Sequence, residues 1–241
     1  MKPNVSAGFI FSVVIISEAF ARVSSRGNRP PAPSRSRTPG KPAATDGTYI
    51  ALNLTDEVHH YIVEYIAKDV TAFSLTDVVG NQRPTVKAKV GKLVYGDGCS
   101  GLTYYPNMNC SDLYMFYIYN AINSPFELRI YINLLYKGTK NHTHTANINN
   151  ASYIYWNPHN VEMYPPNSTN YTEEKCSFTI ETSFTGSFAY QVTGELKGDK
   201  PHNGLDGIGK VAQLNAKLFN DGEDTLMYNI SGTLLHSVTC V

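Results

Sequence analysis

The sequence has 241 residues, of which 20 are Lys or Arg and 20 are Asp or Glu, so its formal net charge is zero. A neutral chain argues against a polybasic nucleic-acid-binding protein, and a hydrophobic fraction of 42% is too high for a disordered chain. Tyr is unusually frequent, with 17 residues against a single Trp. Length and composition predict one folded domain with shorter additional segments.

Residues 1–21 have the pattern of a signal peptide. Lys2 gives a positive start, residues 7–17 are mostly apolar, and Ala19-Phe20-Ala21 fits a small-x-small cleavage site. The apolar run is shorter than the ~20 residues that a membrane-spanning helix needs. We therefore expect cleavage after Ala21, secretion into the extracellular space and no membrane span, with an uncleaved signal anchor as the alternative.

Residues 22–46 are rich in Pro, Ser and basic side chains, and Val23 is their only apolar residue besides Ala and Pro. Burial cannot offset the ordering entropy of such a segment, so we expect a disordered arm. Six basic residues and Asp46 give the arm a charge of +5. Lys2 and Glu18 cancel, so residues 47–241 carry −5. The arm is either a spacer or pro-segment, or a weak contact for polyanions such as sulfated glycans.

Residues 47–241 are dominated by alternation of apolar and polar residues. The pattern is strongest over 226–240 and predicts one long half-buried strand, or two strands joined by a bend at Gly232. Residues 113–119 are apolar on both faces, which favours a central strand. Other predicted strands cover 48–54, 86–95, 126–136, 153–156, 176–184, 188–196 and 208–218.

Turn residues between these strands predict three hairpins. They join 113–120 to 126–136, 176–184 to 188–196, and 208–218 to the last strand through Asn220–Asp224, where Gly222 is free to take a positive φ. Between 55 and 66, apolar residues recur at helical spacing after an acidic first turn, which favours a helix over a strand through 61–66. The sequence thus predicts a single antiparallel β-barrel or β-sandwich domain over 47–241, with one short helix near its N-terminus.

The four cysteines, Cys99, Cys110, Cys176 and Cys240, all lie in this domain. An even number in a chain with a signal peptide predicts two disulfides. Three pairings are open, and we favour Cys99–Cys110 with Cys176–Cys240. No Cys-x-x-Cys motif occurs, which argues against a zinc or redox site.

Asn-x-Ser/Thr sequons are frequent and predict a glycoprotein. The candidate sites are Asn53, Asn109, Asn141, Asn150, Asn167, Asn170 and Asn229. Asn229 falls in the polar phase of the last predicted strand, where a glycan is tolerated.

Signals for catalysis are weak. The sequence contains no nucleophile elbow or phosphate-binding motif in the context that such chemistry needs, so we expect neither enzyme activity nor a cofactor. His142 and His144 could form a metal pair in an extended segment, but no third ligand accompanies them, and a solvated polar loop is the better interpretation. His236 lies in the apolar phase of its strand, which favours a buried, hydrogen-bonded imidazole.

Tyrosines cluster in the middle third of the chain and favour a binding surface as well as strand packing. Tyr104 and Tyr105 lie between predicted strands and are our candidate contact residues. The outline resembles that of secreted lipocalins, although their Gly-x-Trp signature is absent, and equally that of secreted β-sandwich proteins that bind cytokines. The leading hypothesis is a secreted glycoprotein that binds an extracellular protein, such as an immune or signalling molecule. The alternatives are a lipocalin-like carrier of a small apolar ligand and a secreted enzyme.

Overall fold

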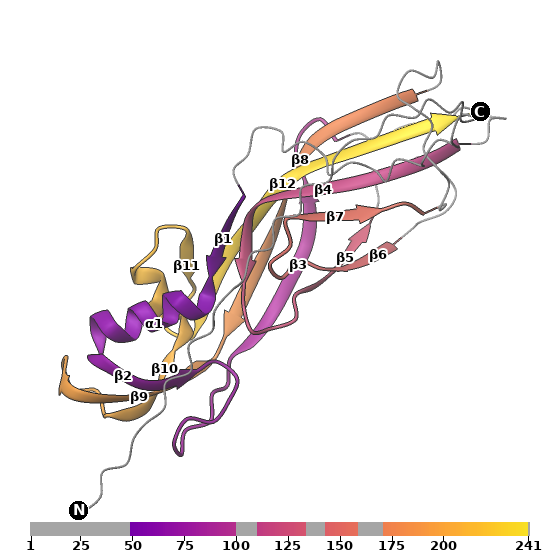
Figure 1. Ribbon diagram of the computed structural model, residues 1–241. Coiled ribbons are helices and arrows are strands. Elements are labelled where there is room, and N and C mark those ends of the chain that lie inside the picture. Colours follow the sequence, from indigo (N-terminus) through magenta and orange to yellow (C-terminus); the bar gives the residue numbers. More distant parts are fainter. Residues whose placement is uncertain (1–48, 100–109, 134–142, 159–170, 241) are drawn as a thin grey trace, which may run out of the picture. The chain divides into compact units, whose positions relative to one another are not determined.

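The computed structural model describes residues 49–99, 110–133, 143–158 and 171–240, which all belong to the unit Ala44–Val241 (Figure 1). The elements in chain order are β1 (Ile50–Asn53), α1 (Leu54–Tyr65), β2 (Ala67–Ser74), β3 (Lys87–Tyr95), β4 (Cys110–Asn123), β5 (Arg129–Asn133), β6 (Thr143–Asn147), β7 (Tyr153–Trp156), β8 (Tyr171–Thr185), β9 (Ser187–Leu196), β10 (Asn203–Gly207), the 3-10 helix η1 (Ile208–Gln213), β11 (Leu218–Asn220) and β12 (Thr225–Cys240).

The largest sheet has seven strands, and its order is β1-β4-β12-β8-β3, with β7 also paired to β4 and β11 to β12. The long strands β4, β12 and β8 run side by side as antiparallel neighbours (Figure 1). Two smaller sheets have the orders β10-β9-β2 and β5-β6. The predicted mostly β fold is confirmed. The predicted closed barrel is wrong, because within the described residues every sheet ends in open edges; the sandwich alternative is compatible with the observed layers.

The last strand behaves as its periodicity predicts. β12 is one continuous strand, and its register with β4 shifts between Ser231 and Gly232, at the predicted bend. A Cβ on Gly232 would collide with the Tyr117 carbonyl oxygen and the Phe178 ring, so only glycine fits this close approach. β4 lies between β12 on one side and β1 and β7 on the other, as its apolar character on both faces predicts.

Strand positions are mostly confirmed, but two of the three predicted hairpins are wrong. β8 pairs with β12 and β3, whereas β9 pairs with β10 and β2 in another sheet. The chain changes sheet at Gly186, whose φ is 122° and whose added Cβ would lie 2.5 Å from the Thr85 carbonyl oxygen. β5 likewise pairs with β6 rather than with β4.

The third predicted hairpin is correct in its turn and wrong in its first strand. β11 pairs with β12, and Gly222 in the turn has a φ of 79°. However, the segment before β11 contains η1 instead of a continuous strand. The glycine-rich stretch before η1 is the strand β10.

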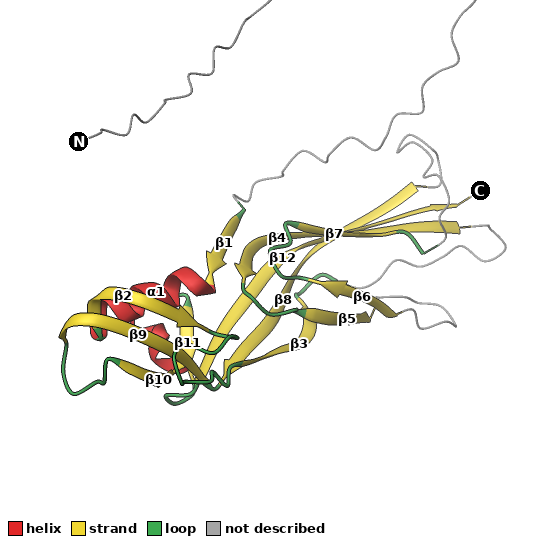
Figure 2. Ribbon diagram, turned by 60° about the horizontal axis from the view of Figure 1, so that its bottom comes forward, coloured by secondary structure: helices red, strands yellow, loops and turns green. Residues whose placement is uncertain are grey.

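The predicted helix is confirmed as α1. Asn53 caps it by accepting a hydrogen bond from the Thr55 backbone N–H at 3.1 Å, and Asp56 and Glu57 lie in the first turn, where the helix dipole favours negative charge. At the other end, Lys197 Nζ donates to the carbonyl oxygens of Val63 and Glu64. α1 packs against β2 and η1 (Figure 2).

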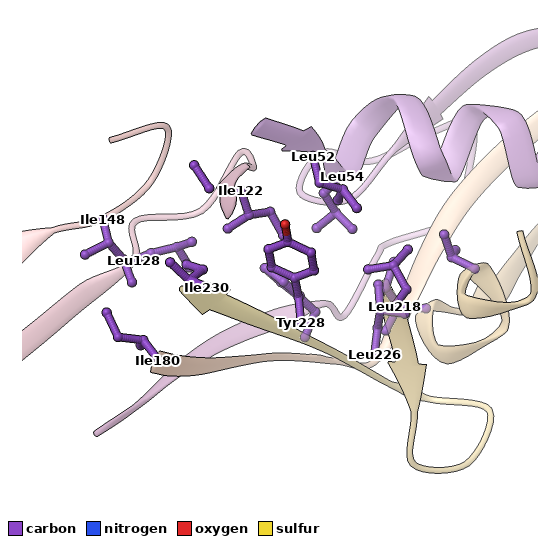
Figure 3. Packing of buried hydrophobic residues seen from close by; sticks show 14 of the residues in the cluster. Leu52, Leu54, Ile122, Leu128, Ile148, Ile180, Leu218, Leu226, Tyr228 and Ile230 are labelled. Carbon is purple, nitrogen blue, oxygen red and sulfur yellow. The ribbon is translucent and has the colours of Figure 1, made fainter. Parts of the chain in front are cut away.

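One hydrophobic core joins the helix, the large sheet and the β5-β6 sheet. Its members near the start of β12 are Leu52, Leu54, Ile122, Leu128, Ile148, Ile180, Leu218, Leu226, Tyr228 and Ile230 (Figure 3). Farther along the sheet, the Phe116 and Phe178 rings meet edge to face with centroids 5.6 Å apart. Each such buried side chain contributes about 1.5–3 kcal/mol, so this core determines which face of each strand points inward.

All four cysteines form disulfides, as predicted, but both favoured pairings are wrong. The bonds are Cys99–Cys176 and Cys110–Cys240. Because β12 runs antiparallel to β4, Cys240 lies directly opposite Cys110, with Cα atoms 4.0 Å apart. Cys176 is opposite Leu234, six residues and therefore about 20 Å from Cys240 along the strand. Two disulfides are typical of proteins that fold in an oxidising compartment, which agrees with the predicted secretion.

Candidate binding face

One side of the large sheet carries a group of aromatic and apolar side chains that we name the tyrosine face. Its members are Met115, Tyr117 and Tyr119 of β4, Tyr153 and Tyr155 of β7, Leu235 of β12 and Tyr171 of β8. Tyr153 and Tyr155 are 52% and 46% exposed, and the others are half-buried. Large side chains that remain this accessible contribute little to the core.

The strand register places these side chains together. Residues directly opposite each other in an antiparallel pair point to the same side of the sheet. Met115 of β4 is opposite Tyr155 of β7 and Leu235 of β12, and Tyr117 is opposite Tyr153. The intervening β4 residues, including Phe116, point into the core. The β4 residues of the tyrosine face are therefore on the outer side of that strand, and packing in the core fixes its inner side.

The centre of the tyrosine face lacks charge, and its margin on β8 carries Glu173 and Lys175. Desolvation, together with the nearby Tyr119 and Glu173, raises the pKa of Tyr117. Tyr171 donates a hydrogen bond to Glu173, and its hydroxyl oxygen lies 3.1 Å from Ser237 Oγ, from which it can accept one. Desolvation and the bond to Glu173 raise the pKa of Tyr171. These two hydroxyls therefore stay protonated at neutral pH, and each donates within the face, Tyr117 to Met115 Sδ at 3.5 Å and Tyr171 to Glu173.

A buried aromatic and polar cluster lies beneath this face. The His236 ring stacks on Tyr114 with centroids 4.1 Å apart and an angle of 11°. Tyr114 donates to Asp112 Oδ2 at 3.1 Å, and His236 Nε2 lies 3.8 Å from the same oxygen. The predicted burial of His236 is confirmed, but its predicted hydrogen bond is not found, since neither ring nitrogen makes one within the described residues. With the adjacent Cys110–Cys240 bond, this stack supports the inner side of β4.

The predicted site residues fall partly outside the described residues. Tyr104, Tyr105, Asn109, Asn141, Asn167 and Asn170 all lie there. Among the remaining sequons, Asn229 is exposed on β12 as its phase predicts, Asn150 is exposed with a φ of 53°, and Asn53 is the half-buried cap of α1. Glycosylation of each remains a prediction.

The candidate metal pair is only half described. His144 belongs to β6, not to a solvated loop, and it stacks on Trp156 at 5.2 Å. Desolvation lowers the pKa of His144. His142 lies outside the described residues. In the part of the chain that the structure describes, no three His, Cys, Asp or Glu side chains are placed to hold a metal ion, and no helix is long and apolar enough to span a membrane.

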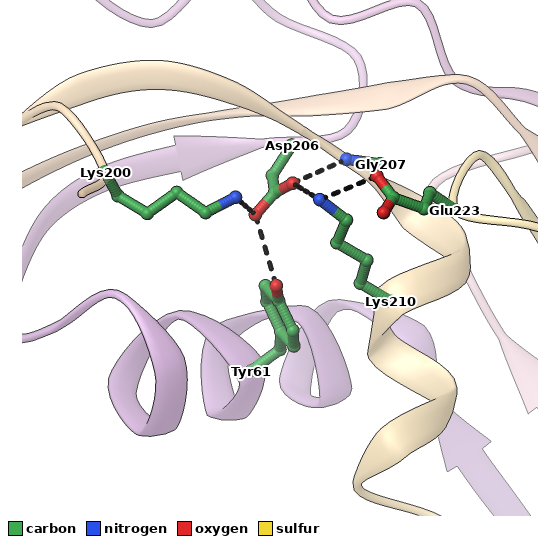
Figure 4. A network of polar contacts seen from close by, with 6 residues as sticks. All are labelled: Tyr61, Lys200, Asp206, Gly207, Lys210 and Glu223. Atoms are coloured by element: carbon green, nitrogen blue, oxygen red, sulfur yellow. Dashed lines mark hydrogen bonds and ion pairs between the residues drawn. The ribbon is translucent and has the colours of Figure 1, made fainter. Parts of the chain in front are cut away.

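Asp206 of β10 forms a polar network that sequence reasoning missed (Figure 4). The carboxylate is 4% exposed, and it accepts hydrogen bonds from Tyr61 of α1 at 3.2 Å and from the Gly207 backbone N–H at 3.0 Å. Lys200 and Lys210 reach its two oxygens at 2.6 and 3.0 Å. Burial alone would raise the pKa of Asp206, but the two ammonium groups outweigh it and hold that pKa below its usual value.

The network joins α1 to the β10-η1 segment, and its members explain its role. Among the described residues each carboxylate oxygen has two partners, Tyr61 and Lys200 on Oδ2 and Gly207 and Lys210 on Oδ1, so the arrangement stabilises the fold. The one local sign of this network in the sequence is that Lys200 and Lys210 lie close to Asp206 in the chain. Tyr61 is far away in the chain.

Comparisons with known proteins assign no family. No protein-family model and no curated protein matches the sequence. Among solved structures, a chain in the crystal structure of the Cry23Aa1 and Cry37Aa1 binary protein complex is 11% identical, with 78% of this chain and 85% of that chain covered and a TM-score of 0.42. A non-toxic crystal protein from Bacillus thuringiensis is 9% identical, with coverages of 79% and 94% and a TM-score of 0.41. The Mpp75Aa1.1 beta-pore-forming protein from Brevibacillus laterosporus is 9% identical, with coverages of 70% and 67% and a TM-score of 0.29. At these identities and scores, the likeness gives this chain neither a family nor an activity.

Proposed function

We propose that this chain is a secreted glycoprotein that binds an extracellular protein partner through the tyrosine face, with immune and signalling proteins as the first candidates. The observation that carries the proposal is the presence of two strongly exposed tyrosines, Tyr153 and Tyr155, beside half-buried Met115 and Tyr117 on a rigid sheet. The proposed role is binding rather than catalysis.

The composition of the tyrosine face supports a protein partner. Protein interfaces are enriched in Tyr and Met at their centres, are depleted of charge there, and have polar margins. Tyrosine also offers a large contact area with a hydroxyl at small entropic cost, which is why it is frequent at energetically dominant positions. The uncharged centre on β4 and β7 and the charged margin at Glu173 and Lys175 follow this arrangement.

The alternatives receive less support. A lipocalin-like carrier needs the interior of a closed barrel, and the described sheets have open edges. A secreted enzyme needs convergent titratable groups in a pocket, whereas the Asp206 network is satisfied by its own chain.

The test is a binding screen of the purified full-length secreted protein against an array of purified extracellular proteins. A partner found in this way is then titrated with the double variant Tyr153→Thr/Tyr155→Thr. Removing two central aromatic contacts costs about 2–3 kcal/mol, so we expect affinity to fall by about 30- to 150-fold. Thr is a good strand residue, which limits effects on the fold.

Phe219→Thr is the matched control, because Phe219 is also an aromatic residue on a strand, 52% exposed, and lies on β11 away from the tyrosine face. We expect it to leave the affinity unchanged. A screen without any protein ligand, or a partner that binds the double variant as well as the unmodified chain, would contradict the proposal.

A further inference from the structure

A shallow groove lies on the same side of the large sheet as the tyrosine face, where β3, β8 and β12 adjoin. Its volume is about 470 Å³, and its lining residues are Gly91, Lys92, Val94, Thr179, Glu181 and Asn229. The register confirms the grouping, because Asn229 is opposite Glu181 and Val94 is opposite Thr179.

A bulge in the edge strand creates the hollow. The register of β3 with β8 shifts between Val90 and Leu93, and Gly91 lies within the shift. Gly91 has no side chain to fill the space, and an added Cβ would stand only 3.1 Å from the Glu181 carbonyl oxygen. The bulge therefore leaves a floor of backbone and of the small Thr179 side chain.

One wall of this groove is an asparagine in a glycosylation sequon. Asn229-Ile230-Ser231 has the required pattern, and Asn229 is exposed because Ile230 is the residue that points into the core. We propose that the groove holds the first N-acetylglucosamine of an N-linked glycan on Asn229, which lies along β8 towards β3. This inference needs passage through the secretory pathway but does not depend on the tyrosine face binding a partner.

The lining suits this sugar. Lys92 and Glu181 offer a donor and an acceptor for ring hydroxyls, and the Thr179 hydroxyl offers both. Val94 is 60% exposed and presents an apolar surface to the N-acetyl methyl group and the C–H face of the ring. Because the sugar is covalently attached at the groove wall, its effective concentration is of the order of millimolar or higher, so individually weak contacts suffice to hold it.

Asn150 provides an internal comparison. It is an exposed sequon in a turn between β6 and β7, and it is not part of the groove. Asn150 does not line this groove, so a glycan there is not covered by it, whereas one at Asn229 is partly covered. The two positions in the same molecule should therefore differ in how readily a glycosidase reaches the attachment bond.

The experiment uses the full chain secreted from a eukaryotic cell line, with glycopeptide mass spectrometry at each sequon during treatment with a peptide N-glycosidase. We expect the folded protein to lose the Asn229 glycan about tenfold more slowly than the Asn150 glycan, which corresponds to about 1.4 kcal/mol of protection. After denaturation the two rates should become equal.

The variant Val94→Ser tests the groove itself, because it removes an exposed apolar wall without touching the core. It should speed release from Asn229 several-fold and leave Asn150 unchanged, with hydrogen exchange of β12 confirming the fold. The proposal is overturned if Asn229 carries no glycan, or if the folded protein releases the Asn229 and Asn150 glycans at equal rates. It is also overturned if Val94→Ser leaves the rate of release from Asn229 unchanged. If Asn150 carries no glycan, the test is the rate of release from Asn229 in Val94→Ser compared with that in the protein without this substitution.

Discussion

Asp206→Asn is the most informative perturbation of the fold, because one nearly isosteric change removes the charge at the centre of the network in Figure 4. The carboxylate is 4% exposed and has four partners: two ammonium groups, a tyrosine hydroxyl and a backbone N–H. An amide retains acceptor capacity on one atom only. The substitution leaves Lys200 and Lys210 without their shared counter-ion, while the shape of the site is preserved.

The expected loss follows from these contacts. Breaking a buried ion pair by removing one partner costs about 3–5 kcal/mol. Here the side chains of Lys200 and Lys210 are 33% and 22% exposed in the folded protein, so both can turn partly towards water and recover hydration. We therefore expect the free energy of unfolding at pH 7 to fall by about 2–3 kcal/mol.

The pH dependence gives a second check. The pKa of Asp206 is lower in the folded protein than in the unfolded chain. Stabilisation by such a group is fully present above its unfolded pKa of about 4 and is lost as the pH falls through the folded pKa. The difference between the unmodified protein and Asp206→Asn should be constant from pH 7 to about 5 and should shrink in more acidic solution.

Urea unfolding followed by fluorescence measures both effects, with Asp221→Asn as the control for loss of an exposed aspartate in a turn. The control should change the free energy of unfolding by less than about 0.5 kcal/mol. The reasoning is refuted if Asp206→Asn also stays within that range. It is equally refuted if the deficit of the variant persists unchanged at a pH where Asp206 is protonated.

Three further predictions concern other parts of the chain. Replacing Cys110 and Cys240 together with Ala should cost about 3–5 kcal/mol, because this bond closes a loop of 130 residues; an unchanged thermal midpoint would contradict this. Gly232→Ala should destabilise by about 2 kcal/mol or more through its collision with the Tyr117 backbone, which urea unfolding measures; a neutral result would show that β4 and β12 can separate at this point. Deletion of residues 22–46 removes a charge of +5 and should lower the NaCl concentration at which the protein elutes from heparin; identical elution would make this segment a plain spacer.

The sequence predicts individual strands much better than their partners. Alternation of apolar and polar residues is local, so the extents of β7, β9 and β12 follow from it closely, although β8 begins five residues before the predicted start at Cys176. Pairing is non-local: the turn at Thr185-Gly186-Ser187 has hairpin composition, but the positive φ of Gly186 carries the chain into another sheet. The disulfide error has the same origin. Cys99, just after β3, is brought to Cys176 by the pairing of β3 with β8, and Cys110 is brought to Cys240 by the pairing of β4 with β12.

The candidate site, too, could be predicted from the sequence only in part. The density of tyrosines predicts a binding surface, but the residues of the tyrosine face come from β4, β7, β8 and β12, so only register reveals that they share one side. Asp206 could not be identified from the sequence, because an acidic residue in a glycine-rich stretch indicates a solvated turn. Its burial depends on Tyr61, 145 residues earlier in the chain.

The interleaved order of the disulfides has a consequence for biosynthesis. As the chain enters an oxidising compartment, Cys99 and Cys110 emerge first, and for 65 further residues they have only each other as partners within the domain. The native partner of Cys110 arrives last, on β12, which must also be inserted between β4 and β8 before the large sheet exists. We therefore expect a newly made chain either to stay reduced until β12 has emerged or to form a transient bond between Cys99 and Cys110 that an isomerase must exchange. Efficient production of this protein should accordingly depend on the host's thiol–disulfide isomerases.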